Sequence, residues 1–218
     1  MKRWVSTGVV VALLLAAALA GCSYQASNTY ASAEACPDIE VVFARGTNEP
    51  PGPGAIGGPF IDSLRKKVGG RSVGAYAVDY PASSDFTKAA DGANDASAHV
   101  QQTVANCPNT RIVLGGFSQG AAVIDLITAV SVPMYGFTAP MPPEVADHVA
   151  AVAVFGNPAI KWAGGPLTEL SPLYGSKTID VCIPYDPICS DGGLIIVHGM
   201  YLMLGLVEGA TDFVAERL

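Results

Sequence analysis

Short apolar runs rich in β-branched residues alternate with longer amphipathic stretches along most of this chain. Five runs are predicted to be strands: Ile39–Ala44, Val73–Asp79, Arg111–Gly115, Val149–Phe155 and Thr178–Ile183. Four stretches are predicted to be helices: Pro59–Val68, Asp91–Ala105, Gln119–Ala129 and Tyr201–Arg217. Strand-helix alternation indicates a parallel sheet covered on both faces, and right-handed crossovers then give an α/β fold, a three-layer α/β/α sandwich with a central five-stranded parallel sheet.

Two loops rich in proline and glycine interrupt this alternation, at Asn48–Gly58 and Val132–Pro143. The first follows the first strand, at the carboxyl edge of the sheet where ligands bind in such folds. The pattern contains no internal repeat and no sign of a second domain, so residues 36–218 are expected to form one domain.

The first 21 residues have the pattern of an export signal. Lys2 and Arg3 precede an apolar stretch, Val9–Ala20, that is too short to span a bilayer. The chain is therefore expected to be secreted or held at the cell surface.

Two cleavage sites are compatible with this signal. Leu19-Ala20-Gly21-Cys22 is similar to a bacterial lipobox, in which Cys22 would be acylated and anchor the chain to a membrane. Cleavage after Ala33 is the alternative, and it lies rather far beyond the apolar stretch. Residues 22–35, rich in Ser, Ala and Asn, are predicted to be a flexible tether.

The charge of the chain is sparse and acidic. Without Lys2 and Arg3, 10 basic residues face 19 acidic ones. This balance argues against a nucleic-acid partner and against electrostatic attachment to anionic lipid. We expect a monomer.

Four cysteines remain beside Cys22, which in an oxidising compartment indicates two disulfides. Cys182 and Cys189 bracket a short proline-containing loop. Cys36 and Cys107 precede the first and third strands, at one edge of a parallel sheet. The predicted pairs are therefore Cys36–Cys107 and Cys182–Cys189. A metal site is the competing use of these cysteines, but neither a C-x-x-C pair nor His-rich spacing supports it.

The most informative motif is Gly116-Phe117-Ser118-Gln119-Gly120, which lies between a predicted strand and a predicted helix. A sharp strand-to-helix turn with serine at its tip is the nucleophile elbow of α/β-hydrolases. Gly70-Arg71-Ser72-Val73-Gly74 has the same spacing, but it follows a helix and leads into a strand. Ser118 is therefore the candidate nucleophile, and Ser72 is expected to be a turn residue.

A serine nucleophile needs an imidazole base, which in this fold follows it in the chain. His99 precedes Ser118 and lies inside a predicted helix. His148 begins the fourth strand, at the edge opposite to the chemistry. His198 lies in a Gly-flanked loop after the last strand and is the candidate base, with a surface or capping role as the alternative.

The loop after the last strand also offers the acid that would orient this base. Asp186 lies within the predicted Cys182–Cys189 loop, which would hold its carboxylate rigidly; a simple turn role is the alternative. Asp191 is a second candidate, whereas Asp180 lies inside the strand.

An oxyanion would need two donors. One is the backbone N–H of Gln119, which follows the nucleophile, and the second is expected from the loop after the first strand, where Thr47 offers an N–H and a hydroxyl. Thr47 could instead cap a turn, and Arg45 could simply pair with an acidic neighbour.

With these residues in place, the chain resembles the cutinase family from about Cys36 to Leu218. The matching motifs are Val42-Phe43-Ala44-Arg45-Gly46-Thr47, Gly92-Ala93-Asn94-Asp95, Gly115-Gly116-Phe117-Ser118-Gln119-Gly120, Phe155-Gly156-Asn157-Pro158 and Cys182…Asp186-Pro187-Ile188-Cys189. The resemblance implies a small α/β-hydrolase without a full lid, a Ser118-Asp186-His198 triad, an oxyanion hole of Thr47 and Gln119, and the same two disulfides.

Three features depart from the family pattern. Phe117 stands where many members have tyrosine, the lipobox is not general, and residues 193–204 are unusually apolar. Leu194–Val197 could rim the active site and dock on lipid or polyester, or could be buried, whereas Tyr201 onward is predicted to be the buried face of the last helix.

The sequence thus predicts an exported serine esterase that acts on lipid, polyester or other acyl esters at a lipid or polymer interface, and that needs no cofactor or metal. A serine peptidase is the weaker enzymatic alternative. A catalytically silent cell-surface binding protein or antigen on the same scaffold is the alternative from another class, and the intact set of candidate residues argues against it.

Overall fold

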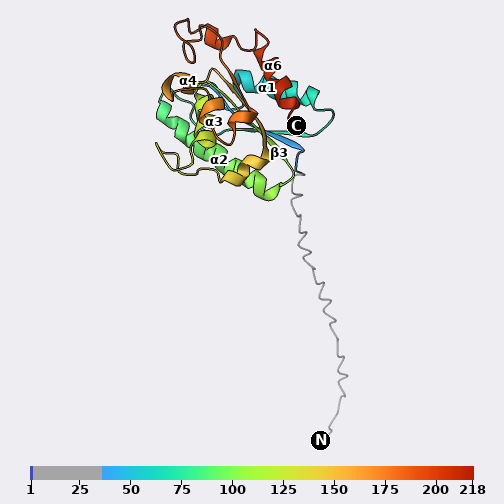
Figure 1. Cartoon of the computed structure of the whole chain (residues 1–218). Helices are drawn as coiled ribbons and strands as arrows, with labels where there is room; N and C mark the ends of the chain where they lie inside the picture. Colours follow the sequence, from blue (N-terminus) through green and yellow to red (C-terminus); the bar gives the residue numbers. More distant parts are fainter. Residues whose placement is uncertain (2–35) are drawn as a thin grey trace. The chain divides into compact units, whose positions relative to one another are not determined.

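A computed structural model describes Met1 and residues 36–218, and its centre is a five-stranded parallel sheet in the order β2-β1-β3-β4-β5 (Figure 1). The strands are β1 (Ile39–Ala44), β2 (Val73–Ala77), β3 (Arg111–Phe117), β4 (Val149–Phe155) and β5 (Thr178–Val181). The strand order reverses direction between β1 and β3, which makes the carboxyl end of these two strands the switch point where such sheets bind ligands.

Helices cover both faces of the sheet, as predicted. α1 (Gly54–Lys67) packs beside α6 (Leu206–Ala215) on one face, and α2 (Ala89–Asn106) packs beside α3 (Gln119–Ala129) on the other (Figure 1). The shorter elements are α4 (Ala159–Trp162), α5 (Leu167–Leu170) and four 3-10 turns at Phe86–Lys88, Pro143–His148, Gly175–Lys177 and Val197–Gly199. The predicted three-layer α/β/α sandwich is confirmed.

Alternating side chains of the central strands form two separate cores. Val41, Phe43 and Val113 pack with α1 and α6, whereas Val42 and Leu114 pack with α2 and α3. Because both faces are buried, the strands are almost continuously apolar, which is the usual pattern for parallel sheets. The two cores together fix the edge at which β1, β3 and β4 end.

The predicted loop Asn48–Gly58 is wrong in its second half, because α1 begins at Gly54 and carries Pro59 within it. Glycine and proline favour a loop locally, but propensity is a weak preference that tertiary packing overrides. Here the buried ring of Phe60 packs between those of Phe43 and Phe155 and holds the early turns of α1 on the sheet.

The last helix begins at Leu206 rather than at Tyr201, because Gly205 has a φ of 72° and interrupts the helical backbone. Only Tyr201 of the preceding segment is fully buried, whereas Leu202, Met203 and Leu204 are exposed. The prediction of a buried face from Tyr201 onward is therefore wrong for these three residues.

Three of the predicted strand ends also shift. β2 ends at Ala77 rather than at Asp79, because the carbonyls of Val78 and Tyr80 accept hydrogen bonds from Arg45 instead of from a strand. β5 ends at Val181 rather than at Ile183, and β3 continues through Phe117, which brings the strand directly to the candidate nucleophile.

Both predicted disulfides are present. Cys36–Cys107 joins the residues before β1 to the end of α2 with Cα atoms 5.5 Å apart, and Cys182–Cys189 closes a short loop after β5. Two disulfides are compatible with an extracellular location. The predicted signal (residues 1–21), the tether (22–35) and Cys22 lie outside the described residues, apart from Met1, and stay predictions. Within residues 36–218, no helix has both the length and the apolarity needed to cross a membrane.

The long disulfide is expected to contribute to stability mainly by restricting the unfolded chain. Replacing Cys36 and Cys107 together by alanine should lower the free energy of unfolding by about 4 kcal/mol, because the bridge closes a loop of 71 residues. Urea denaturation of both proteins measures this difference. An unchanged midpoint would show that the unfolded chain gains no freedom when the bridge is removed.

Candidate active site

Ser118 lies at the turn between β3 and α3 in a strained conformation, with a φ of 56° and a ψ of −118°. A non-glycine residue held there costs roughly 1–3 kcal/mol. The turn is too tight for flanking side chains: a Cβ on Gly116 would lie 2.3 Å from the Gly120 carbonyl oxygen, and one on Gly120 would lie 2.0 Å from that of Ala44. The sharp strand-to-helix turn predicted from the glycine spacing is therefore present, with Ser118 at its tip.

The backbone of Ser118 is tied to the end of the neighbouring strand. Its N–H donates to the Phe155 carbonyl oxygen at 2.9 Å, and its own carbonyl accepts from Ala121 at 2.9 Å in the first turn of α3. Ser118 is buried, with only 8% of the residue's surface accessible. These bonds fix the hydroxyl-bearing carbon at the carboxyl edge of the sheet.

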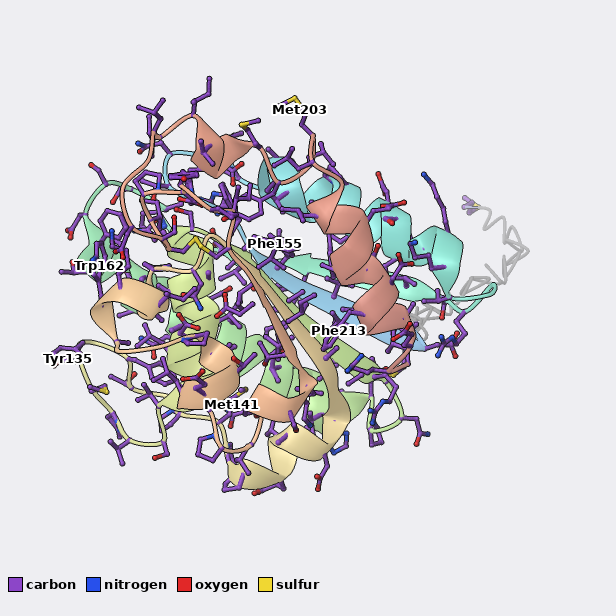
Figure 2. All side chains as sticks on the ribbon, turned by 45° about the horizontal axis from the view of Figure 1, so that its top comes forward. Tyr135, Met141, Phe155, Trp162, Met203 and Phe213 are labelled. Atoms are coloured by element: carbon purple, nitrogen blue, oxygen red, sulfur yellow. A yellow bond between two sulfur atoms is a disulfide. The ribbon has the colours of Figure 1, made fainter. Side chains whose placement is uncertain are left out.

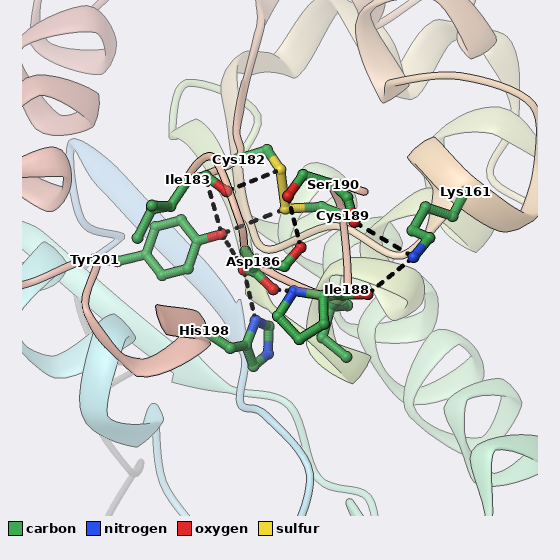
Figure 3. Close-up of polar contacts among 10 residues, drawn as sticks. Lys161, Cys182, Ile183, Asp186, Ile188, Cys189, Ser190, His198 and Tyr201 are labelled. Carbon is green, nitrogen blue, oxygen red and sulfur yellow. Dashed lines mark hydrogen bonds and ion pairs between the residues drawn. A yellow bond between two sulfur atoms is a disulfide. The ribbon is translucent and has the colours of Figure 1, made fainter. Parts of the chain in front are cut away.

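Asp186 and His198 form a buried pair (Figure 3). Nδ1 of His198 lies 2.7 Å from Oδ2 of Asp186, and the carboxylate is fully inaccessible. Oδ1 accepts the N–H of Ile188 at 2.9 Å, and the Cys182–Cys189 disulfide closes the loop that carries it. Both carboxylate oxygens of Asp186 are thus engaged, so the carboxylate is held in place. The imidazole ring of His198, which it contacts, therefore has little rotational freedom.

The pair lies beside the end of β4, to which Ser118 is bonded. The imidazole is stacked on the ring of Phe117 with centroids 4.7 Å apart, and a Cβ on Gly156 would lie 2.5 Å from its Cε1. Nε2 of His198 is buried and has no hydrogen-bond partner among the described residues. Among the described residues, a hydrogen bond therefore joins His198 to Asp186, but none joins His198 to Ser118. In unliganded enzymes the hydrogen bond between base and nucleophile is often long and tightens when substrate binds.

The alternatives weighed from sequence lie elsewhere. Ser72 bonds Asp38 at the opposite edge of the sheet, with both its N–H and its hydroxyl 2.7 Å from Oδ2. His99 lies 3.1 Å from a carboxylate oxygen of Glu40. Asp191 is exposed, in contrast to the buried Asp186.

The candidate oxyanion loop, residues 45–49, is built on two charged side chains. Arg45 donates to the carbonyls of Glu49, Val78 and Tyr80, rather than pairing with a carboxylate as the simpler alternative supposed. The Glu49 carboxylate accepts the N–H of Gly46 at 2.6 Å and that of Ala55 at 2.8 Å. The loop is therefore rigid and tied to the start of α1.

The two candidate oxyanion donors lie on this loop, at Thr47, and at the start of α3, at Gln119. The hydroxyl oxygen of Thr47 is buried and has no hydrogen-bond partner among residues 36–218. Gln119 is fully buried at the N-terminus of α3, and its side chain donates to the Ser83 carbonyl at 3.0 Å. Helix N-termini favour negative charge. The sequence did not predict that Arg45 and Glu49 hold this loop in place. Their role is seen only in the backbone groups to which their side chains bond.

Comparison with known proteins now identifies the family. The family model described as Cutinase matches residues 35–218.

The chain belongs to the cutinase family.

Its relatives and structural neighbours are ester hydrolases. It is 52% identical over 215 residues to carboxylesterase Culp1 of Mycobacterium tuberculosis, covering 96% of this chain and 94% of that one. It is 55% identical over 183 residues to phospholipase Culp4 of the same organism, covering 84% and 80%. A Trichoderma reesei cutinase with a phosphonate inhibitor superposes with a TM-score of 0.67 at 30% identity, over 83% of this chain and 76% of that chain. An acetyl xylan esterase has the same fold, with a TM-score of 0.71 at 23% identity over 84% and 99%. The predicted family is confirmed, and the chain is a carboxylic ester hydrolase.

The sequence did not predict a third contact to the candidate acid, Asp186. The hydroxyl of Tyr201 donates to Oδ2 of Asp186 at 2.5 Å, on the same oxygen that His198 approaches (Figure 3). Tyr201 is fully buried, and burial together with this hydrogen bond raises the pKa of its phenol. With its pKa raised above the usual value of about 10, the phenol is a neutral donor at neutral pH. Its position three residues after His198 was the available signal, but the apolar residues around it indicated a helix.

Tyr201 is therefore expected to act as a positioning residue. Tyr201→Phe should lower kcat/KM for soluble esters by about tenfold, because a buried hydrogen bond to a charged group is lost. It should also move the acidic limb of the pH–rate profile upward, because Oδ2 then interacts with the imidazolium alone. Initial rates from acid to alkaline pH measure both effects.

Tyr76→Phe is the matched control. It removes another tyrosine–carboxylate hydrogen bond, 3.0 Å to Asp95, that lies outside the site. Its pH profile should match that of the wild type. A Tyr201→Phe enzyme with reduced activity and an unmoved profile would mean that Tyr201 only supports the fold.

Proposed function

We propose that this protein is an exported serine esterase that cleaves carboxylic esters through an acyl-enzyme. Ser118 is the nucleophile, His198 the general base and Asp186 the residue that orients it. The observation that carries the proposal is the buried Asp186–His198 pair, 2.7 Å apart, next to the strand end that anchors the strained Ser118.

In the first half of the reaction, the hydroxyl oxygen of Ser118 attacks the ester carbonyl carbon while Nε2 of His198 takes its proton. The carbonyl oxygen becomes an oxyanion, which would accept hydrogen bonds from the Gln119 N–H and from Thr47. The buried hydroxyl of Thr47, without a partner among the described residues, supports this role. Each such donor is worth roughly 3 kcal/mol in the transition state.

Collapse of the tetrahedral intermediate breaks the bond to the alcohol, which leaves with the proton from Nε2. Water then attacks the acyl-Ser118 ester, His198 again takes a proton, and the carboxylic acid is released with Ser118 restored. The Asp186 carboxylate stabilises the imidazolium in both halves. The steps use only protons and water, so the proposed mechanism requires no metal or organic cofactor.

The substrate is proposed to be an acyl ester met at a lipid or polymer interface. Six large apolar side chains on either side of His198 are about half exposed or more: Leu194, Ile195, Ile196, Leu202, Met203 and Leu204. Met203 projects outward from the rim that carries them (Figure 2). Exposed apolar patches of this kind mark interaction sites. The protein is further proposed to be exported and monomeric. Acylation of Cys22 would anchor it to a membrane.

The nucleophile assignment has a matched pair of variants within the chain. Ser118→Ala should reduce hydrolysis of p-nitrophenyl butyrate by at least about 10³-fold, because removal of a triad nucleophile leaves only binding and oxyanion stabilisation. Ser72→Ala alters the other G-x-S-x-G serine and should keep wild-type activity. Retained activity in Ser118→Ala would disprove the mechanism, and a silent wild type would favour the binding-protein alternative.

The interfacial role predicts a substrate-dependent loss. The double variant Ile195→Ser/Met203→Ser should hydrolyse emulsified triglyceride several-fold more slowly, since less apolar surface binds the interface, at about 25 cal/mol for each Å² removed. Activity on soluble p-nitrophenyl butyrate should be unchanged. Leu173→Ser, an exposed leucine outside these segments, serves as control. Equal losses on both substrates would mean that the segments shape the site and do not dock.

A further inference from the structure

One short segment, residues 80–83, contacts both halves of the candidate oxyanion hole. It follows β2 and belongs to no helix or strand, yet Tyr80 and Ala82 within it are buried. Its carbonyl and hydroxyl groups take part in hydrogen bonds to the loop of residues 45–49 and to Gln119 at the start of α3. Segment 80–83 therefore joins two elements that lie far apart in the chain.

The first half is the loop that carries Thr47. The hydroxyl of Tyr80 donates to the Arg45 carbonyl oxygen at 2.5 Å, and the Tyr80 carbonyl accepts from the Arg45 guanidinium at 2.5 Å. The N–H of Gly46 belongs to the same peptide group as the Arg45 carbonyl, and it donates to Glu49 at 2.6 Å. This peptide group is thus held at both its oxygen and its nitrogen, which fixes the direction in which the chain enters Thr47.

The other end of this loop is held by Ala82, whose carbonyl accepts the N–H of Asn48 at 2.6 Å. Ala82 is fully buried with a φ of 48°, and Asn48 has a φ of 60°. Residues other than glycine adopt this left-handed region at a cost, and they stay there when the surrounding contacts impose it. Thr47 thus lies between two hydrogen bonds to segment 80–83.

The second half is the turn into α3. The side-chain amide of Gln119 donates to the Ser83 carbonyl oxygen at 3.0 Å. Gln119 is fully buried, and its Oε1 has no hydrogen-bond partner among the described residues. The next residue, Gly120, lies so close to the loop that a Cβ on it would be 2.6 Å from the Arg45 carbonyl oxygen. The carbonyl that Tyr80 holds is therefore also the group against which this turn packs.

We propose that segment 80–83 positions the two oxyanion donors relative to each other, and that Tyr80 and the side chain of Gln119 are positioning residues. The inference rests on the proposed function, because it requires an oxyanion formed at Ser118. Two donors stabilise an oxyanion only when both point at the place where the charge forms, and a misplacement of about 1 Å is costly. The sheet brings the ends of β1 and β3 together, and segment 80–83 fixes the loop and the turn beyond them.

Tyr80 is the informative residue to change, because its hydroxyl donates without carrying a charge. Burial raises the pKa of the phenol, although the nearby Arg45 guanidinium acts in the opposite direction. Arg45 itself donates to three carbonyls, and its guanidinium carbon lies 5.0 Å from the centre of the Tyr80 ring. Substitution of Arg45 would leave those carbonyls without their donor, whereas Tyr80→Phe removes one hydrogen bond and keeps the ring.

Removal of the Tyr80 hydroxyl tests the first contact. Tyr80→Phe should lower kcat for p-nitrophenyl butyrate about tenfold and leave KM within about twofold, because the oxyanion exists only in the transition state and the intermediate. The inhibition constant of an alkyl trifluoromethyl ketone should rise by the same factor as kcat/KM falls. Ser118 adds to the carbonyl carbon of this ketone, and the carbonyl oxygen becomes a tetrahedral oxyanion in the same place.

A double-mutant cycle tests whether the two halves are coupled through the segment. Gln119→Met removes the side-chain amide, keeps the backbone N–H and should lower kcat to a similar extent. If both variants loosen the same segment, Tyr80→Phe/Gln119→Met should lose about tenfold in total, and not the roughly hundredfold expected of independent sites. Tyr76→Phe, which removes a tyrosine hydrogen bond outside the site, is the matched control and should keep wild-type constants.

The outcomes distinguish this inference from the proposed function. Melting temperatures are compared first, and Gln119→Met with the ketone decides alone if Tyr80→Phe does not fold. Wild-type kcat in both variants, a change confined to KM, or additive losses in the cycle would overturn the positioning role while Ser118 chemistry stands. Full activity of Ser118→Ala, with unchanged inhibition by the ketone, would instead remove the proposed mechanism and the oxyanion with it.

Discussion

The close passage of backbone segments at the carboxyl edge of the sheet is the constraint on which the site depends. The turn of β3 into α3 approaches β1 so closely at Gly120 that no side chain fits between them. The same turn is bonded to β4 through the Ser118 N–H and the Phe155 carbonyl. Three adjacent strands therefore hold one strained residue, and the strain persists because the surrounding structure over-determines it.

Asp186 and His198 are fixed by a disulfide and by hydrogen bonds and not by regular structure. Between β5 and α6 the chain contains only a 3-10 turn, yet Asp186 is fully inaccessible. A disulfide closes its loop, Ile188 binds one carboxylate oxygen, and His198 and Tyr201 bind the other. Rigid support of this kind allows a loop to hold catalytic geometry, and it leaves the apolar residues on either side of His198 exposed for other uses.

The sequence predicted the fold well where one local signal dominated. The buried strands Ile39–Ala44 and Val149–Phe155 and the helix Gln119–Ala129 have the predicted bounds, because hydrophobic runs and the glycine turn leave no competing interpretation. The order of the three histidines along the chain and the spacing of the cysteines were enough to predict that Asp186 and His198 lie close together.

What the sequence could not predict depends on contacts between distant residues. The start of α1 is set by Phe60 packing on the sheet, against the local preference of Pro59. The roles of Arg45, Glu49 and Tyr201 are set by backbone carbonyls, N–H groups and a carboxylate far away in the chain.

A buried pair of acids, Asp125 and Asp180, lies next to the candidate active site and makes the stability of the fold depend on pH. One Asn157 amide group bonds both Asp125 and Asp180, just after the glycine against which His198 rests. Burial raises the pKa of both acids. A carboxyl whose pKa is raised by folding favours the folded state at low pH, and this contribution declines as pH rises from its ordinary value of about 4 toward the raised one. The Asn157 amide, which donates to both carboxyls, and the Leu167 N–H, which donates to Asp180, partly offset the cost of burying these two acids.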